Sequence, residues 1–130
     1  MKKLFYSASF YMILGLLFGV FYREFTKIND YSGVTQLSTL HTHTLILGMF
    51  FFLIVLTLEK VFTLSSNKNF GKWFAFYHVS LLGILATMTV RGIYQVKGME
   101  LAGLNHVAGL THTLYAIAIV WFFIQLKKKI

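Results

Sequence analysis

Residues 31–58 read YSGVTQLSTLHTHTLILGMFFFLIVLTL and contain no Asp, Glu, Lys or Arg. A helix that crosses a bilayer needs about 20 mostly apolar residues, so this run is long enough to span a membrane. Three further uncharged runs occur, at residues 4–22, 73–90 and 101–126. The sequence therefore predicts four transmembrane helices.

The composition of the 130-residue chain supports this prediction, because 57% of the residues are hydrophobic and only 12% are charged. A soluble domain of this size could not readily bury 14 Phe, 7 Tyr and 2 Trp. The chain has no cysteine, which excludes thiolate metal sites and covalently attached haem. Its net charge of +8 comes from residues that flank the apolar runs, a pattern typical of membrane topology rather than of nucleic-acid binding.

We expect an all-α, up-down bundle of four transmembrane helices that forms a single membrane domain over residues 1–130, because the connections are short. The expected helices cover about residues 4–23, 37–59, 73–94 and 103–126. With both termini in the cytoplasm, eight basic residues lie inside and four outside, and this excess favours that orientation. The alternative for residues 4–22 is a cleaved signal peptide, but no small-x-small site precedes Arg23.

One short motif occurs twice. The tetrapeptide Thr-His-Thr-Leu stands at residues 42–45 and again at residues 111–114. An arginine precedes each copy at nearly the same spacing, since the separation from Arg23 to His43 is one position shorter than that from Arg91 to His112. Two matched features at nearly one offset predict two repeated helical hairpins.

The repeated histidines lie at similar depths in the membrane. The separation from His43 to Glu59 is only one position longer than that from His112 to Lys127. If these charged residues mark the same membrane surface, the two histidines differ in depth by about 1.5 Å. Two imidazoles at one level on parallel helices can ligate one haem. The spacing therefore predicts a cofactor and metal site at His43 and His112.

The other three histidines are weaker candidates for metal ligands. His41 points about 200° away from His43 on one helix, so it either faces a different cofactor or, near the outer helix end, lies in the headgroup layer. His106 lies near an outer helix end, where a histidine in the headgroup layer costs little. His78 is close in sequence to Lys72 at the cytoplasmic edge, so it belongs to a second site or is a hydrogen-bonded core residue.

Arg23 and Arg91 are candidates for binding haem propionates. Both lie near the outer ends of their helices, and arginine binds carboxylates through paired hydrogen bonds. The alternative is that they reach lipid phosphates or pair with Glu24 and Glu100. The duplication of these arginines favours the first interpretation.

The stretch LHTHTLILGM at residues 40–49 resembles the haem-ligand helices of the haem–copper oxidase subunit I superfamily. The whole chain is also similar to a family of small four-helix membrane proteins of unknown function that is grouped with that superfamily. The resemblance implies non-covalent haem b at His43 and His112, less firmly at His41, and it implies oligomers. The chain has no adjacent His-His pair to match the oxidase copper site, so the resemblance does not extend to oxygen reduction.

Our leading hypothesis is a membrane haem b protein that transfers electrons to or from a redox partner, or binds a small gas, rather than an enzyme. One alternative is a transporter that moves a transition metal or protons along its histidines. Another is a structural subunit of a larger membrane complex. Gly15-x-x-x-Gly19 predicts a close helix contact, either within the chain or with another subunit, and we expect homo-oligomers through this motif or through the second and fourth helices. Further packing glycines are expected at Gly48, Gly83 and Gly109.

Overall fold

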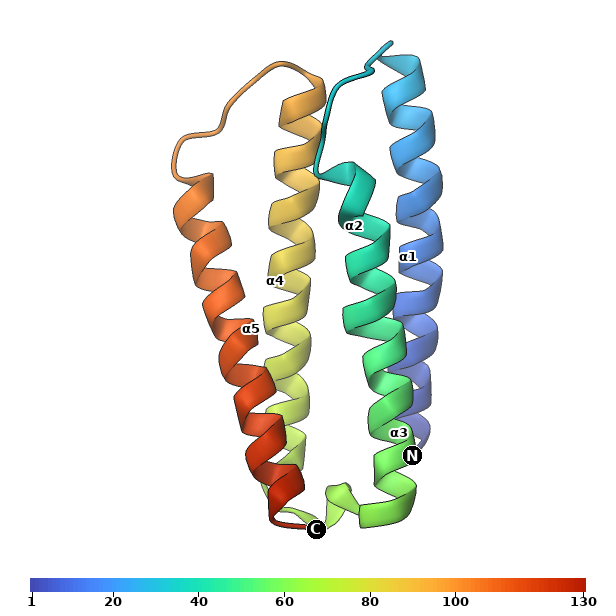
Figure 1. Ribbon diagram of the computed structural model, residues 1–130, viewed down its shortest axis with the longest axis vertical. Helices are drawn as coiled ribbons and strands as arrows, with labels where there is room; N and C mark the ends of the chain where they lie inside the picture. Colours follow the sequence, from blue (N-terminus) through green and yellow to red (C-terminus); the bar gives the residue numbers. More distant parts are fainter.

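A computed structural model describes residues 1–130, and all of its regular secondary structure is helical, with no β-strand. The elements are α1 (Lys2–Ile28), α2 (Leu37–His43), the π-helix η1 (Thr44–Phe50), α3 (Phe51–Phe62), the 3₁₀ turn η2 (Leu64–Ser66), α4 (Phe70–Val96) and α5 (Leu104–Lys127). The elements α2, η1 and α3 follow one another without a break, and we call them together the second span. The predicted all-α fold with four long helices is confirmed (Figure 1).

Each long helix is apolar and long enough to cross a bilayer, with 27, 26, 27 and 24 residues in chain order. Even 24 residues reach about 36 Å, which exceeds the hydrocarbon core of about 30 Å. Large apolar side chains such as Leu17, Ile54 and Phe123 point outward and are exposed. Lipid is the solvent in which such a surface is stable, so the chain is a multi-pass membrane protein.

The helices alternate in direction, and both termini lie at the same end of the bundle (Figure 1). We call this the terminal end and the opposite one the distal end. The connections 29–36 and 97–103 lie at the distal end, and residues 63–69 connect helices at the terminal end. Helix α1 continues to Ile28, past the predicted end near residue 23, because nothing in its polar last turn breaks a helix.

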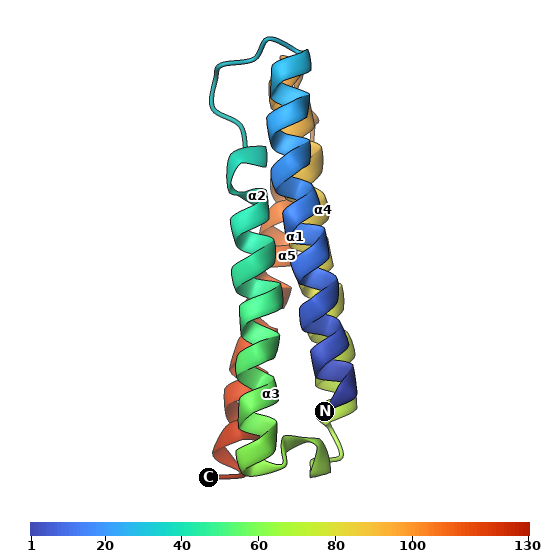
Figure 2. The same cartoon turned by 90° about the vertical axis from the view of Figure 1, so that its right-hand side faces the viewer.

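Two hairpins form the bundle. Helix α1 packs along the second span and α5 packs along α4, while α2 packs against α4 and joins the hairpins (Figures 1 and 2). Tyr77 of α4 links three helices, because its hydroxyl donates to the Leu47 carbonyl oxygen at 2.7 Å and lies 2.9 Å from the Tyr115 hydroxyl. The Trp73 indole N–H donates to the Ala118 carbonyl oxygen at 2.9 Å. These aromatic side chains form the core of the terminal half.

Gly15 and Gly83 hold matching places in the two hairpins, because each precedes an arginine of the repeat by the same number of positions. A Cβ on Gly15 would lie 2.7 Å from the Leu45 side chain, and one on Gly83 would lie 2.9 Å from Thr111. Each glycine therefore lets the first helix of its hairpin approach the second closely. This correspondence supports the internal repeat.

The motif Gly15-x-x-x-Gly19 packs inside the chain, which is one of the two arrangements that the sequence left open. Gly15 is buried, and a Cβ on Gly19 would lie 3.9 Å from the side chain of His41. Small residues allow close approach but carry no information about which helix approaches. Here the second span is that helix.

The second span contains a π-helix, which the sequence analysis did not predict. Its backbone widens over Thr44–Phe50, directly after His43. Tyr11 of α1 packs so closely that a Cβ on Gly48 would lie 2.3 Å from the tyrosine ring. The Leu47 carbonyl oxygen in this segment accepts the hydrogen bond from Tyr77. Short π-segments are frequent at functional sites, and this one lies immediately below a repeated histidine.

Candidate functional site

The two repeated histidines make the same local hydrogen bond. His43 Nδ1 lies 3.0 Å from the Thr39 carbonyl oxygen, and His112 Nδ1 lies 2.7 Å from the Ala108 carbonyl oxygen. In both cases the acceptor is the carbonyl one helical turn earlier. A carbonyl oxygen only accepts, so Nδ1 carries the proton and donates in each ring. The opposite nitrogen, Nε2, is left with its lone pair free, as a metal ligand requires.

Both histidines are among the residues that line one cavity of about 130 Å³, which we call the histidine cavity; His43 is half-buried there and His112 is exposed. It lies between α2 and α5, and α4 forms its third wall. The residues around it are Gln36, Thr39, His43, Thr87, Met88, Arg91, Ala108 and His112. Thr87 and Arg91 are one helical turn apart, so they lie on one face of α4. The structure thus brings the favoured histidine pair and one of the two arginines to a common site.

Arg91 also lines a second cavity of about 300 Å³, at the distal end, which we call the distal cavity. Polar side chains there include Tyr94, Gln95, Glu100 and Asn105. The Arg91 guanidinium donates to the Asn105 side-chain oxygen at 2.6 Å. No carboxylate, Glu100 included, lies within ion-pairing distance of Arg91. Its charge is therefore available to an anionic group that reaches either cavity.

Arg23 does not join this site. Its side chain is 81% exposed, and its closest acidic partner is Glu24 at 3.9 Å. It is not among the residues that line the histidine cavity. The predicted propionate role therefore loses its support for Arg23 and keeps it for Arg91. The repeat places both arginines at the distal end, but only the helix in the middle of the bundle faces the histidines.

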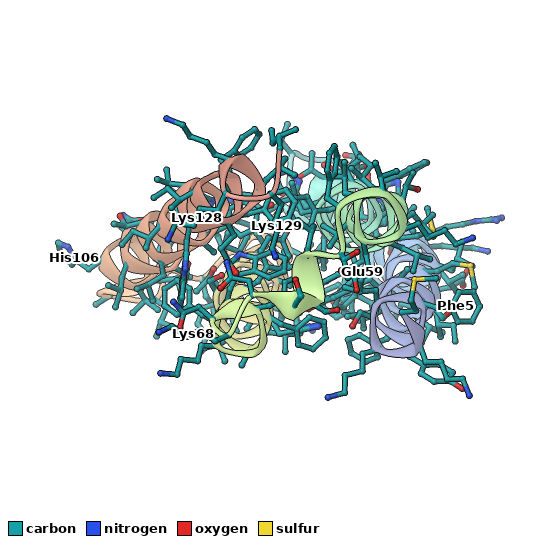
Figure 3. The ribbon with its side chains drawn as sticks, turned by 90° about the horizontal axis from the view of Figure 1, so that it is seen from below. Phe5, Glu59, Lys68, His106, Lys128 and Lys129 are labelled. Atoms are coloured by element: carbon teal, nitrogen blue, oxygen red, sulfur yellow. The ribbon has the colours of Figure 1, made fainter.

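His41 and His106 also point away from the histidine cavity. His41 lies against Gly19 of α1, and its Nδ1 is buried without a hydrogen-bond partner. His106 is exposed on the outer side of α5, where Figure 3 shows it projecting from the bundle. Neither residue is able to ligate a metal held between His43 and His112.

His78 is a hydrogen-bonded core residue. Its Nε2 lies 3.0 Å from the Ser7 hydroxyl, and its Nδ1 lies 2.8 Å from the Tyr11 hydroxyl. Since Ser7 donates its own proton to the Lys3 carbonyl oxygen, it accepts from Nε2–H, and Tyr11 donates to Nδ1. The ring also stacks on Phe52 at a centroid distance of 4.8 Å. With both nitrogens occupied, His78 has no free ligand atom.

Four residues that line the two cavities were not predicted from the sequence as site residues: Gln36, Thr39, Thr87 and Asn105. The only signal for Thr39 was its place one turn before His43, where a backbone carbonyl can orient the imidazole. The only sequence signal for Thr87 is that it stands one helical turn before Arg91. Gln36 and Asn105 belong to segments at the helix starts, whose positions depend on how the hairpins dock.

Comparison with known proteins places the chain in one family. No curated protein and no solved structure matches it. The predicted membership of the haem–copper oxidase subunit I superfamily is wrong, because the family that covers the whole chain has no such description. The resemblance rested on residues 40–49, and a short apolar helix with His-x-His is not specific enough to identify a superfamily. The chain belongs to the family described as protein of unknown function (DUF2871), which it matches over residues 1–129.

Proposed function

We propose that this membrane protein binds haem b non-covalently, with His43 and His112 as axial ligands. The observation that carries the proposal is the matched orientation of the two imidazoles. Both donate Nδ1–H to a helix carbonyl, both keep Nε2 free, and both line the histidine cavity. Hydrogen bonds of this kind fix the tautomer and ring orientation of histidine ligands in metal proteins.

The number of available ligands favours haem over a free metal ion. No group of three or more His, Cys, Asp or Glu side chains lies close enough to hold an ion. A transition-metal ion in a protein is usually held by at least three side chains. A porphyrin provides the equatorial ligands itself, so two imidazoles complete the coordination of its iron.

The histidine cavity alone is too small to enclose a haem. The histidine cavity, at about 130 Å³, is smaller than the roughly 300–1,000 Å³ of pockets that enclose an organic ligand. The adjoining distal cavity, at about 300 Å³, also contains Arg91. Arg91, which lines both cavities, is the residue that would bind the carboxylates of the haem.

Two histidine ligands favour electron transfer over gas binding, because they leave no open coordination position. Haem supplies one-electron redox chemistry when it is bound. The protein would supply the two imidazoles that line the histidine cavity and the positive charge of Arg91 beside them. Electron transfer also requires a redox partner, which we expect at the distal end, where the polar cavity lies. Homo-oligomers through the second span and α5 stay a prediction.

The small size of the histidine cavity favours a second candidate, a single transition-metal ion with water ligands. Imidazole binds zinc, copper and nickel well, and a hydrated ion needs little space.

One experiment separates the two candidates. Protein expressed with ample haem and purified in detergent is examined by absorption spectroscopy, oxidised and reduced, with and without carbon monoxide. A Soret band that carbon monoxide leaves unchanged supports two histidine ligands. Colourless protein that contains stoichiometric metal supports the second candidate and contradicts haem binding.

Replacing Arg91 by Leu is expected to weaken haem binding about tenfold, since hydrogen bonds to charged groups contribute about 1.5–3 kcal/mol. Arg23→Leu is the matched control, because it removes the same charge from an exposed site at the same end of the bundle. The measurement is the rate of haem transfer to excess apomyoglobin. Equal rates for the two variants would contradict a propionate role for Arg91.

We also propose that both termini lie in the cytoplasm, because the terminal end carries eight of the twelve Lys and Arg residues. The chain has no cysteine, so single cysteines can report topology. In intact cells a membrane-impermeant maleimide is expected to label Val34→Cys, whose site is 91% exposed at the distal end, but not Lys128→Cys. Permeabilised cells should show label at both sites. The reverse pattern in intact cells would contradict the orientation.

A further inference from the structure

A third cavity, of about 310 Å³, lies at the terminal end and plays no part in the proposed haem site. We call it the terminal cavity. Helix α1 and the residue before it contribute Met1, Lys3 and Leu4, and α4 contributes Phe70 and Phe74. Glu59 of α3 and Ser65 of the following turn complete its polar side. Its volume is within the range of pockets that bind small organic groups.

Glu59 is the chemically unusual residue of this cavity. It is 7% exposed, and Figure 3 shows it between the ribbons of α3 and α1. Its carboxylate accepts hydrogen bonds from the Ser65 N–H, at 2.8 Å, and from the Ser65 hydroxyl. No Lys or Arg lies within ion-pairing distance of it. Because a carboxylate has about four acceptor positions, Glu59 retains capacity for a further donor, and a buried carboxylate favours a cationic one.

A positively charged residue lies on the α1 side of the same cavity. Lys3 lines it, yet forms no ion pair with Glu59. The cavity therefore has an anionic residue on one side and a cationic residue on the other. Its remaining walls are the apolar side chains of Leu4, Phe70 and Phe74. A ligand that carries both a cation and an anion matches this distribution of charge.

An apolar groove of about 460 Å³ lies between the same two helices, farther into the membrane. Leu14 and Phe18 of α1 form one side, and Leu82, Leu85 and Val90 are among the α4 residues on the other. From Phe74 to Leu82, α4 rises about 12 Å. Between the two levels, His78 of α4 is hydrogen bonded to Ser7 and Tyr11 of α1. The α1–α4 boundary is thus charged at the membrane surface and, beyond His78, apolar at the depth of acyl chains.

We propose that this boundary is a binding site for a zwitterionic phospholipid with a primary ammonium group, that is, a phosphatidylethanolamine. Its ammonium donates to Glu59, its phosphate pairs with Lys3, and an acyl chain occupies the apolar groove. A choline headgroup has no N–H to donate to the carboxylate. An anionic glycerol headgroup has no cation and places a second negative charge beside Glu59.

The test compares lipids on purified, delipidated protein in detergent by native mass spectrometry. Dioleoyl phosphatidylethanolamine, its N-methyl and N,N-dimethyl derivatives, phosphatidylcholine and phosphatidylglycerol are the probes. We expect phosphatidylethanolamine to bind about tenfold more tightly than phosphatidylcholine, since a hydrogen bond to a charged group contributes about this factor. Affinity should fall with each added methyl group. This series uses the unaltered protein, so it stands even if a variant fails to fold.

Single-residue variants then test which residues cause the preference for phosphatidylethanolamine. Glu59→Gln is expected to abolish the difference between ethanolamine and choline lipids. Lys3→Gln is expected to weaken both equally. The matched control is Glu100→Gln, which removes a carboxylate from the distal end. Equal binding of the two zwitterionic lipids to the unaltered protein, or tighter binding of phosphatidylglycerol, would overturn the proposal. Because the site shares no residue with the histidine cavity, either result leaves the haem proposal unaffected.

Discussion

His112→Ala and His43→Ala are each expected to reduce haem affinity by at least about 100-fold, since losing even an outer partner of a metal ligand costs about 10- to 100-fold. Each variant removes one Nε2 from the histidine cavity and leaves the second imidazole in place. The reduced protein should then bind carbon monoxide, because the iron gains an open position. The measurement is the haem content and the reduced spectrum of each purified variant, with and without carbon monoxide.

The matched control for both is His106→Ala. His106 lies on α5, fewer than two turns before His112, and it is exposed on the outer side of the bundle. Its removal should leave haem content and spectrum unchanged. Loss of haem in His106→Ala, or full retention in both cavity variants, would show that the cofactor is not held between His43 and His112.

The arrangement of spans could be predicted from the sequence because it depends on distance along the chain, and the same count predicts that the two repeated histidines meet. Uncharged runs identify four membrane helices, and a rise of about 1.5 Å per residue fixes the level of each side chain. Counting from Glu59 and from Lys127 placed His43 and His112 at one level. The structure brings these two residues to the same cavity.

Which side a residue faces could not be predicted in the same way, because it depends on the rotation of each helix in the bundle. Arg23 and Arg91 have nearly equivalent positions in the repeat, yet only Arg91 reaches the histidine cavity. The same is true of the glycines, whose neighbours depend on the rotation of the helix. A Cβ on Gly48 or Gly83 would meet a neighbouring helix within 3.0 Å, whereas one on Gly109 would meet nothing within 4 Å. A small residue permits close packing without specifying a partner.

Glu59 shows a second limit of sequence reasoning. In the sequence it marks the end of an apolar run, as an interfacial charge does in most membrane helices. In the structure it is buried, because the chain turns back at Thr63, where φ is 50°, and brings Ser65 to its carboxylate. Left-handed backbone at a non-glycine residue is uncommon, so this turn had no clear signal in the sequence.

Gly48→Ala is expected to destabilise the protein by about 2 kcal/mol or more, since adding a methyl group to a packed core costs about 1–3 kcal/mol. The new Cβ would lie 2.3 Å from the Tyr11 ring. Tyr11 is fully buried and is hydrogen bonded to His78, so it has little freedom to move away. Gly109→Ala is the matched control, because its Cβ would meet nothing within 4 Å. The measurement is unfolding by heat or by sodium dodecyl sulfate in mixed micelles.

A double variant tests whether Tyr11 is the cause. Combining Gly48→Ala with Tyr11→Ala should cost less than the sum of the two single changes, because removing the ring removes the clash. Additive costs would show that the alanine acts on the π-helix itself.

The same variants connect packing to the haem site, since the π-helix begins directly after His43. If α1 must move to accept the Cβ, the second span shifts and haem affinity falls with stability. Haem binding that stays unchanged in a strongly destabilised Gly48→Ala would show that the distal half of the second span is held by its contact with α4 instead.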